Sequence, residues 1–87
     1  MNERSSQETI LLVGLSPLPE ILLPLVFRSG TIVIFYGEGV NVPWNGEPHF
    51  YYLESDILGR GRSPFSQCLT EGEVAGRLLR ADRVLTF

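Results

Sequence analysis

Two short stretches of the chain, residues 10–13 and 32–36, are apolar at every position and rich in β-branched side chains. A strand that is apolar on both faces is typical of a parallel sheet with helices packed on both sides. Residues 50–53 and 84–87 are two further, largely apolar runs bounded by polar or turn-forming residues, and we expect them to be strands as well. The hydrophobic pattern therefore predicts four strands.

The segment between the first two strands, residues 16–29, has apolar residues at helical spacing, at Leu18, Ile21, Leu22, Leu25 and Val26. Ser16 can cap this helix, and Pro17 and Pro19 fit its first turn, where a missing N–H is tolerated. Pro24 removes one internal hydrogen bond, so we expect the helix to kink or end there.

Two more helices are expected in the second half of the chain. Residues 54–60 form a short helix whose early acids, Glu54 and Asp56, suit the positive end of its dipole. Thr70 and Glu73 have the spacing of a capping box, and the helix that follows has an apolar face made of Val74, Ala75, Leu78, Leu79 and Ala81. Residues 37–48 and 62–69 are predicted to be loops.

This order of elements predicts one α/β domain over residues 9–87, preceded by a frayed or disordered tail at residues 1–8. The expected architecture is a small, mostly parallel, four-stranded sheet flanked by helices, similar to flavodoxin. A chain of 87 residues buries only about 60–65% of its unfolded surface. We therefore expect it to gain stability from a partner.

Composition excludes several kinds of chemistry. All seven basic residues are arginine, which rules out a Schiff-base lysine and a Walker-type phosphate loop. One histidine and one cysteine rule out an intrachain disulfide and a zinc site built mainly from Cys and His. The net charge of −3 disfavours direct binding to nucleic acid or anionic membrane. No apolar run approaches the ~18–20 residues of a membrane span, and a lone thiol fits a reducing cytoplasm.

Two motifs follow the second and third strands. The first is Glu38-Gly39-Val40, and the second runs through Tyr51 or Tyr52, Leu53, Glu54, Asp56, Ile57, Arg60 and Gly61. Together with the Ser16-Pro17 turn and the last strand, they resemble the DsrE/DsrF/DsrH-like sulfur-relay family over residues 9–87. The DsrH (TusB) branch, with its Tyr-x-Leu-Glu-x-Asp-Leu-x-x-Arg-Gly pattern, is the most similar.

The resemblance implies sulfur transfer through a cysteine persulfide, in tRNA wobble-uridine thiolation or in sulfur oxidation. The active subunit of the family carries its cysteine just after the third strand, where this chain has Glu54 and Ser55. The DsrH branch generally lacks that cysteine as well. The resemblance therefore implies an accessory or scaffold subunit without activity of its own, assembled with itself or with paralogous DsrE/DsrF-like subunits and needing no cofactor. The alternative is a non-catalytic, homo-oligomeric interaction module of the same fold.

Cys68 is the one candidate catalytic residue, as a persulfide carrier near the start of the last helix, where a thiolate would be favoured. The competing interpretation, which we favour, is a cysteine that packs as a small apolar residue. His49 is read as a residue at a strand edge rather than as a base. The predicted binding or interface residues are Trp44, Tyr51, Tyr52, Glu54, Asp56 and Arg60.

Overall fold

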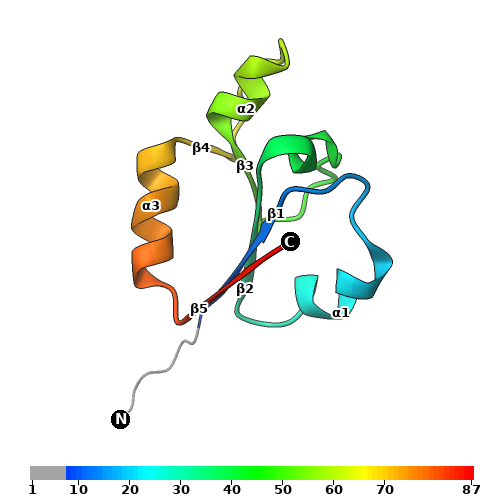
Figure 1. Ribbon diagram of the computed structural model, residues 1–87, viewed down its shortest axis with the longest axis vertical. Helices are drawn as coiled ribbons and strands as arrows, with labels where there is room; N and C mark the ends of the chain where they lie inside the picture. Colours follow the sequence, from blue (N-terminus) through cyan, green and yellow to red (C-terminus); the bar gives the residue numbers. More distant parts are fainter. Residues whose placement is uncertain (1–7) are drawn as a thin grey trace.

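The computed structural model describes residues 8–87; the predicted tail lies, except for its last residue, outside this part. Figure 1 shows the helices arranged around one sheet. Along the chain the elements are β1 (Thr9–Val13), η1 (Glu20–Leu22), α1 (Leu23–Val26), β2 (Thr31–Phe35), η2 (Gly37–Asn41), β3 (Phe50–Leu53), α2 (Glu54–Gly59), β4 (Cys68–Leu69), α3 (Glu71–Arg80) and β5 (Arg83–Thr86). None of the helices in this part of the chain is long and apolar enough to cross a membrane.

The sheet has five parallel strands in the order β4-β3-β2-β1-β5, so the prediction of four strands was wrong. The additional strand, β4, lies in the predicted loop 62–69 and pairs Cys68 with Tyr52 and Leu69 with Leu53. Two residues are too few to show a period of two, and only the pairing with β3 makes them a strand. The order also differs from the flavodoxin order 2-1-3-4-5, because β1 lies between β2 and β5.

The two faces of the sheet are covered unequally. On the first face, η1, α1, η2 and α2 surround a large buried cluster that includes Leu11, Val33, Phe35, Phe50 and Tyr52. On the second face, α3 alone packs over a cluster with three buried residues, Ile10, Ile34 and Leu69. Figure 1 shows α3 on the opposite side of the sheet from α1. The second face is therefore the thinner layer of the protein.

The segment after β1 is not the single helix that the periodicity predicted. A 3-10 turn, η1, begins after Pro19 with no side-chain cap, so Ser16 is not the helix cap. The one-turn helix α1 follows, with Pro24 at its second position. Pro24 neither kinks nor ends this helix, because the amide of a first-turn residue has no partner inside the helix. Ile21, expected on the buried face, is 85% exposed.

Helix α3 begins as predicted. The Thr70 hydroxyl accepts a hydrogen bond from the Glu73 backbone N–H at 3.2 Å, and the Glu73 carboxylate accepts one from the Thr70 N–H at 2.8 Å. This reciprocal pair satisfies two backbone donors at the start of the helix. Val74, Leu78 and Ala81 pack against the second face. Leu79 is 88% exposed and is not part of that apolar face.

Candidate functional site

The turns that follow the parallel strands meet at the carboxyl edge of the sheet, the edge at which open α/β sheets bind ligands. Gly39 in η2 lies so close to the end of β1 that a Cβ on it would overlap the Val13 carbonyl oxygen. Its N–H donates to the Tyr36 carbonyl at 2.8 Å. Backbone packing therefore requires the glycine of the Glu-Gly-Val motif.

Asp56 connects α2 to the turn after β2. Its Oδ2 accepts a hydrogen bond from the Gly37 N–H at 2.7 Å, and both groups are partly buried. Gly37 has a φ of +53°, in the left-handed region that favours glycine. The Asp56 carboxylate therefore holds the turn at Gly37, directly before the Glu38-Gly39-Val40 motif. This contact joins residues 19 positions apart, so the sequence alone did not show it.

We expect Asp56→Ala to lower the free energy of unfolding by about 1.5–3 kcal/mol, because it removes a charge-assisted hydrogen bond and leaves the Gly37 donor without its partner. Urea denaturation would measure the change. Ser55→Ala is the matched control, since the exposed Ser55 hydroxyl makes only a 3.5 Å contact with Glu71. Equal stability of Asp56→Ala and Ser55→Ala would contradict the structural role of Asp56.

Two arginines, Arg60 in the second motif and Arg62 directly after it, add further links to the first motif. The Arg60 guanidinium forms an ion pair with Glu38 at 3.2 Å, and Arg62 Nη1 donates to the Val40 carbonyl at 2.8 Å. The Glu38 side chain is 68% exposed, so its ion pair contributes little to stability. Together with the Asp56 contact, these bonds join the two sequence motifs into one structural unit. Glu54, the remaining acid of the second motif, is half-buried at the start of α2.

Cys68 does not lie in a loop, as predicted, but on strand β4. It is half-buried, packs against the first-face cluster, and its Sγ accepts a long hydrogen bond from the Phe65 N–H at 3.5 Å. Its strand partner is Tyr52. These surroundings fit a cysteine that packs as a small apolar residue.

The aromatic residues predicted at an interface lie in three different environments. Tyr52 is fully buried, with its ring stacked on Phe35 at 5.0 Å, so this residue belongs to the core and not to an interface. Tyr51 lies on the second face, and the Arg77 guanidinium carbon is 4.5 Å from its ring centroid. Trp44 is 37% exposed. Its indole N–H donates to the Glu47 carbonyl at 2.7 Å, which holds the ring at the edge of its loop.

His49 connects β3 to the end of α1. Its Nε2 lies 3.0 Å from the Val26 carbonyl oxygen, so the proton of a neutral ring belongs on Nε2. The rings of Phe27 and Phe50 pack edge-on against the imidazole. Within residues 8–87, no three His, Cys, Asp or Glu side chains come together as a possible metal site. His49 lies directly before β3, and its contacts are with the Val26 carbonyl and two aromatic rings.

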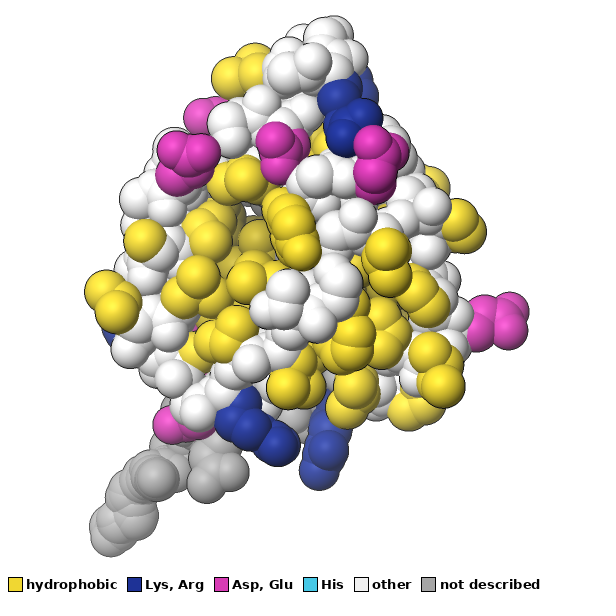
Figure 2. Space-filling view, in the orientation of Figure 1, with side chains coloured by type: hydrophobic (Ala, Val, Ile, Leu, Met, Phe, Trp, Pro, Cys, Tyr) yellow, Lys and Arg dark blue, Asp and Glu magenta, His cyan; other side chains and the backbone are white. Residues whose placement is uncertain are grey.

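An apolar hollow opens on the second face near the carboxyl edge, between α3 and the sheet. Its volume is about 240 Å³, and it is lined by Leu12, Ile34, Tyr36, Leu53, Val74 and Thr86. Figure 2 shows hydrophobic side chains gathered there. Four of its six lining residues are aliphatic, and the other two, Tyr36 and Thr86, carry hydroxyl groups, so its surface is suited mainly to apolar contacts.

No protein-family model, curated protein or solved structure matches this chain.

Proposed function

We propose that this protein is an accessory or scaffold subunit of a sulfur-relay system, with a fold of the DsrE/DsrF/DsrH-like kind. The proposal is carried by the identity of the residues at the carboxyl end of β3. In the family that the sequence resembles, the active subunit has its cysteine there, whereas this chain has Glu54 and Ser55 at the start of α2. The motif residues around this position hold the structure together, as Asp56 does through Gly37.

The position of the thiol supports a role without persulfide chemistry. A sulfur carrier needs an accessible thiolate for attack on the donor persulfide. Cys68 instead lies on an edge strand, half-buried against the core, and within residues 8–87 its sulfur accepts a hydrogen bond from the Phe65 N–H and from no cationic side chain.

Assembly with other subunits is supported by apolar surface on both sides of the sheet. Ile21 and Phe27, on the segment that includes η1 and α1, are 85% and 59% exposed. The apolar hollow lies on the opposite, thinly covered face. Exposed apolar surface of this kind is typical of subunit contacts in small proteins. By the same proposal, the partners are paralogous DsrE/DsrF-like subunits in the cytoplasm.

Two measurements on the purified chain test this proposal. After incubation with a cysteine desulfurase and cysteine, intact mass spectrometry is expected to show no sulfur on the wild-type protein. After mixing with a DsrE-like subunit that carries the persulfide cysteine, native mass spectrometry is expected to show a stable complex. A Cys68-dependent gain of sulfur, lost in Cys68→Ser, would make the protein a carrier and overturn the scaffold role.

The second candidate is a homo-oligomeric interaction module with no part in sulfur transfer. The thin cover of the second face, where one helix packs over five strands, favours a self-association that completes this layer. The same native spectra separate the two candidates. A dimer or larger homo-oligomer that ignores the DsrE-like subunit supports the module, whereas a mixed complex supports the relay subunit.

A further inference from the structure

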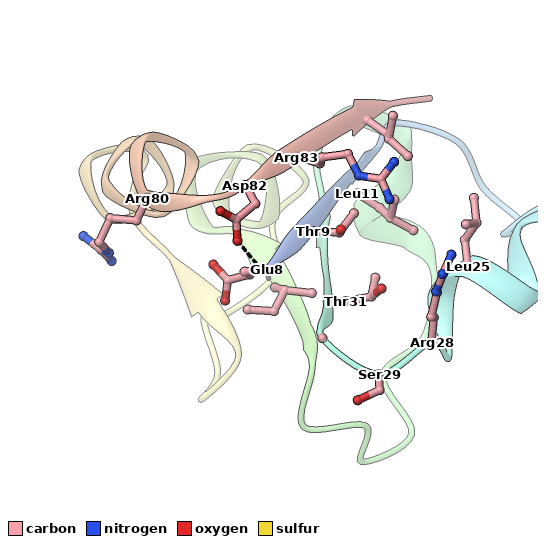
Figure 3. Close-up of a pocket in the computed structure, with 13 residues that line it drawn as sticks. Glu8, Thr9, Leu11, Leu25, Arg28, Ser29, Thr31, Arg80, Asp82 and Arg83 are labelled. Carbon is pink, nitrogen blue, oxygen red and sulfur yellow. Dashed lines mark hydrogen bonds between the residues drawn. The ribbon is translucent and has the colours of Figure 1, made fainter. Parts of the chain in front are cut away.

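A large cleft lies at the amino edge of the sheet, opposite the edge that holds the two sequence motifs. Its volume is about 920 Å³, within the usual range of small-molecule sites. The cleft lies at the starts of β1, β2 and β5 and at the turn that follows α1, as Figure 3 shows. Nothing in the proposed relay function uses this region.

Two arginines reach into the same half of the cleft from different elements. Arg28 follows α1, and Arg83 is the first residue of β5. In Figure 3 both side chains extend into the space between β5 and α1. The single ion pair within residues 8–87 joins Arg60 to Glu38, so no described carboxylate lies within 4.0 Å of either guanidinium. Two such guanidiniums are a suitable site for an oxyanion.

The acids near the cleft are oriented away from these arginines. Asp82 accepts a hydrogen bond from the Glu8 backbone N–H at 2.8 Å. Figure 3 shows Asp82 and Glu8 on the far side of β1 from Arg28. The positive charge of the α1 side is therefore not neutralised locally, although the whole chain has a net charge of −3.

The remaining walls of this half of the cleft combine apolar and hydroxyl groups. Leu25 and Leu85 line it as half-buried side chains that pack against the first-face cluster, whereas Leu11 at the same place is fully buried. Thr9 and Thr31, at the starts of β1 and β2, add hydroxyls, while their backbone N–H groups donate to the Gly30 and Arg28 carbonyls. A ligand with a charged end and an apolar body fits such a lining.

We propose that this cleft binds a small organic oxyanion, a phosphate or carboxylate that carries an apolar group. The Arg28 and Arg83 guanidiniums bind the anionic end, and the leucine wall receives the apolar group. The site is on the opposite edge of the sheet from the two motifs. A negative binding result here would therefore leave the sulfur-relay proposal unchanged, and failure of that proposal would leave this one unchanged.

The test is a titration of the ¹⁵N-labelled full chain, followed by NMR, with four probes: phenyl phosphate, benzoate, inorganic phosphate and benzyl alcohol. We expect shifts of the Ser29–Thr31 and Arg83 amides and the tightest binding for phenyl phosphate. Comparison of phenyl phosphate with benzoate shows which anion the site prefers. Weaker binding of inorganic phosphate and of the neutral alcohol shows that both halves of the ligand are needed.

Variants of the two arginines make the test specific. Arg28→Gln and Arg83→Gln are each expected to weaken phenyl phosphate binding roughly tenfold or more, the effect of losing one charge-assisted hydrogen bond. Arg77→Gln removes the same charge from α3, outside the cleft, and is expected to bind like wild type. Equal losses in all three variants, or no amide shifts at millimolar probe, would overturn the proposal. The amide spectrum of each variant reports directly whether it is folded.

Discussion

Replacement of Gly39 by alanine is expected to lower the free energy of unfolding by about 3 kcal/mol or more, at the upper end of the cost of overpacking. The new methyl group would overlap the carbonyl oxygen of Val13. The Cβ atom is fixed to the backbone of η2, and the atom that it meets is a backbone oxygen of β1. No rotation of a side chain can therefore relieve the overlap. Relief requires η2 to move away from β1, which would also separate the buried Val40 from the core.

Gly59→Ala is the matched control for this prediction. Gly59 is exposed, is the last residue of α2, and has nothing within 4 Å of the position that a Cβ would take. Alanine there is expected to leave stability unchanged or to raise it by up to about 1 kcal/mol, because alanine loses less backbone entropy in a helix than glycine. Urea denaturation of both variants gives the comparison. Similar stabilities of the two variants would show that the contact between η2 and β1 is loose.

Tyr52→Phe is expected to raise the free energy of unfolding by about 1–2 kcal/mol. The Tyr52 hydroxyl is buried and has no hydrogen-bond partner among the described residues. An unpaired buried polar group lacks the hydrogen bonds that water provides in the unfolded chain. Phenylalanine keeps the stacking against Phe35 and removes only that oxygen. Urea denaturation at pH 7 measures the gain.

The same residue makes stability depend on alkaline pH. Burial, with a smaller contribution from the Glu47 charge, raises the pKa of Tyr52 above its ordinary value near 10. Above pH 10 the unfolded chain releases this proton while the folded protein retains it, so stability falls as pH rises. The loss attributable to Tyr52 is up to about 1.4 kcal/mol per pH unit, and below pH 10 it vanishes.

Denaturation at pH 7 and pH 11 tests this dependence. The advantage of Tyr52→Phe over wild type is expected to be larger at pH 11, because phenylalanine has no proton to lose. Tyr51→Phe serves as the control, since Tyr51 is half-buried on the second face and its hydroxyl is not an unpaired buried group. A Tyr52→Phe variant that is less stable than wild type at pH 7 would show that the hydroxyl has a partner, such as a bound water.

The predicted elements differ in how closely they match the structure, and local signals explain the difference. The predicted strands at 10–13 and 50–53 match β1 and β3 to within one residue, because continuous apolar runs report burial on two faces. The capping box at Thr70 was confirmed because both of its hydrogen bonds lie within four residues. The prediction of a single helix over residues 16–29 was wrong. It gave more weight to the helical spacing of the apolar residues than to the three prolines, each of which lacks a backbone N–H donor.

The sequence by itself determined the α/β class, the main strands, the cap of α3 and the absence of a thiol after β3, because these depend on neighbouring residues. Only the tertiary structure decided that Cys68 is on a strand, that Tyr52 is core, that Asp56 binds Gly37 and that Arg28 and Arg83 share a cleft. Each of these depends on groups 16 or more positions apart in the chain. The order of the strands in the sheet decides which distant segments meet. The sequence of a crossover connection does not by itself say at which edge of the sheet the next parallel strand is added.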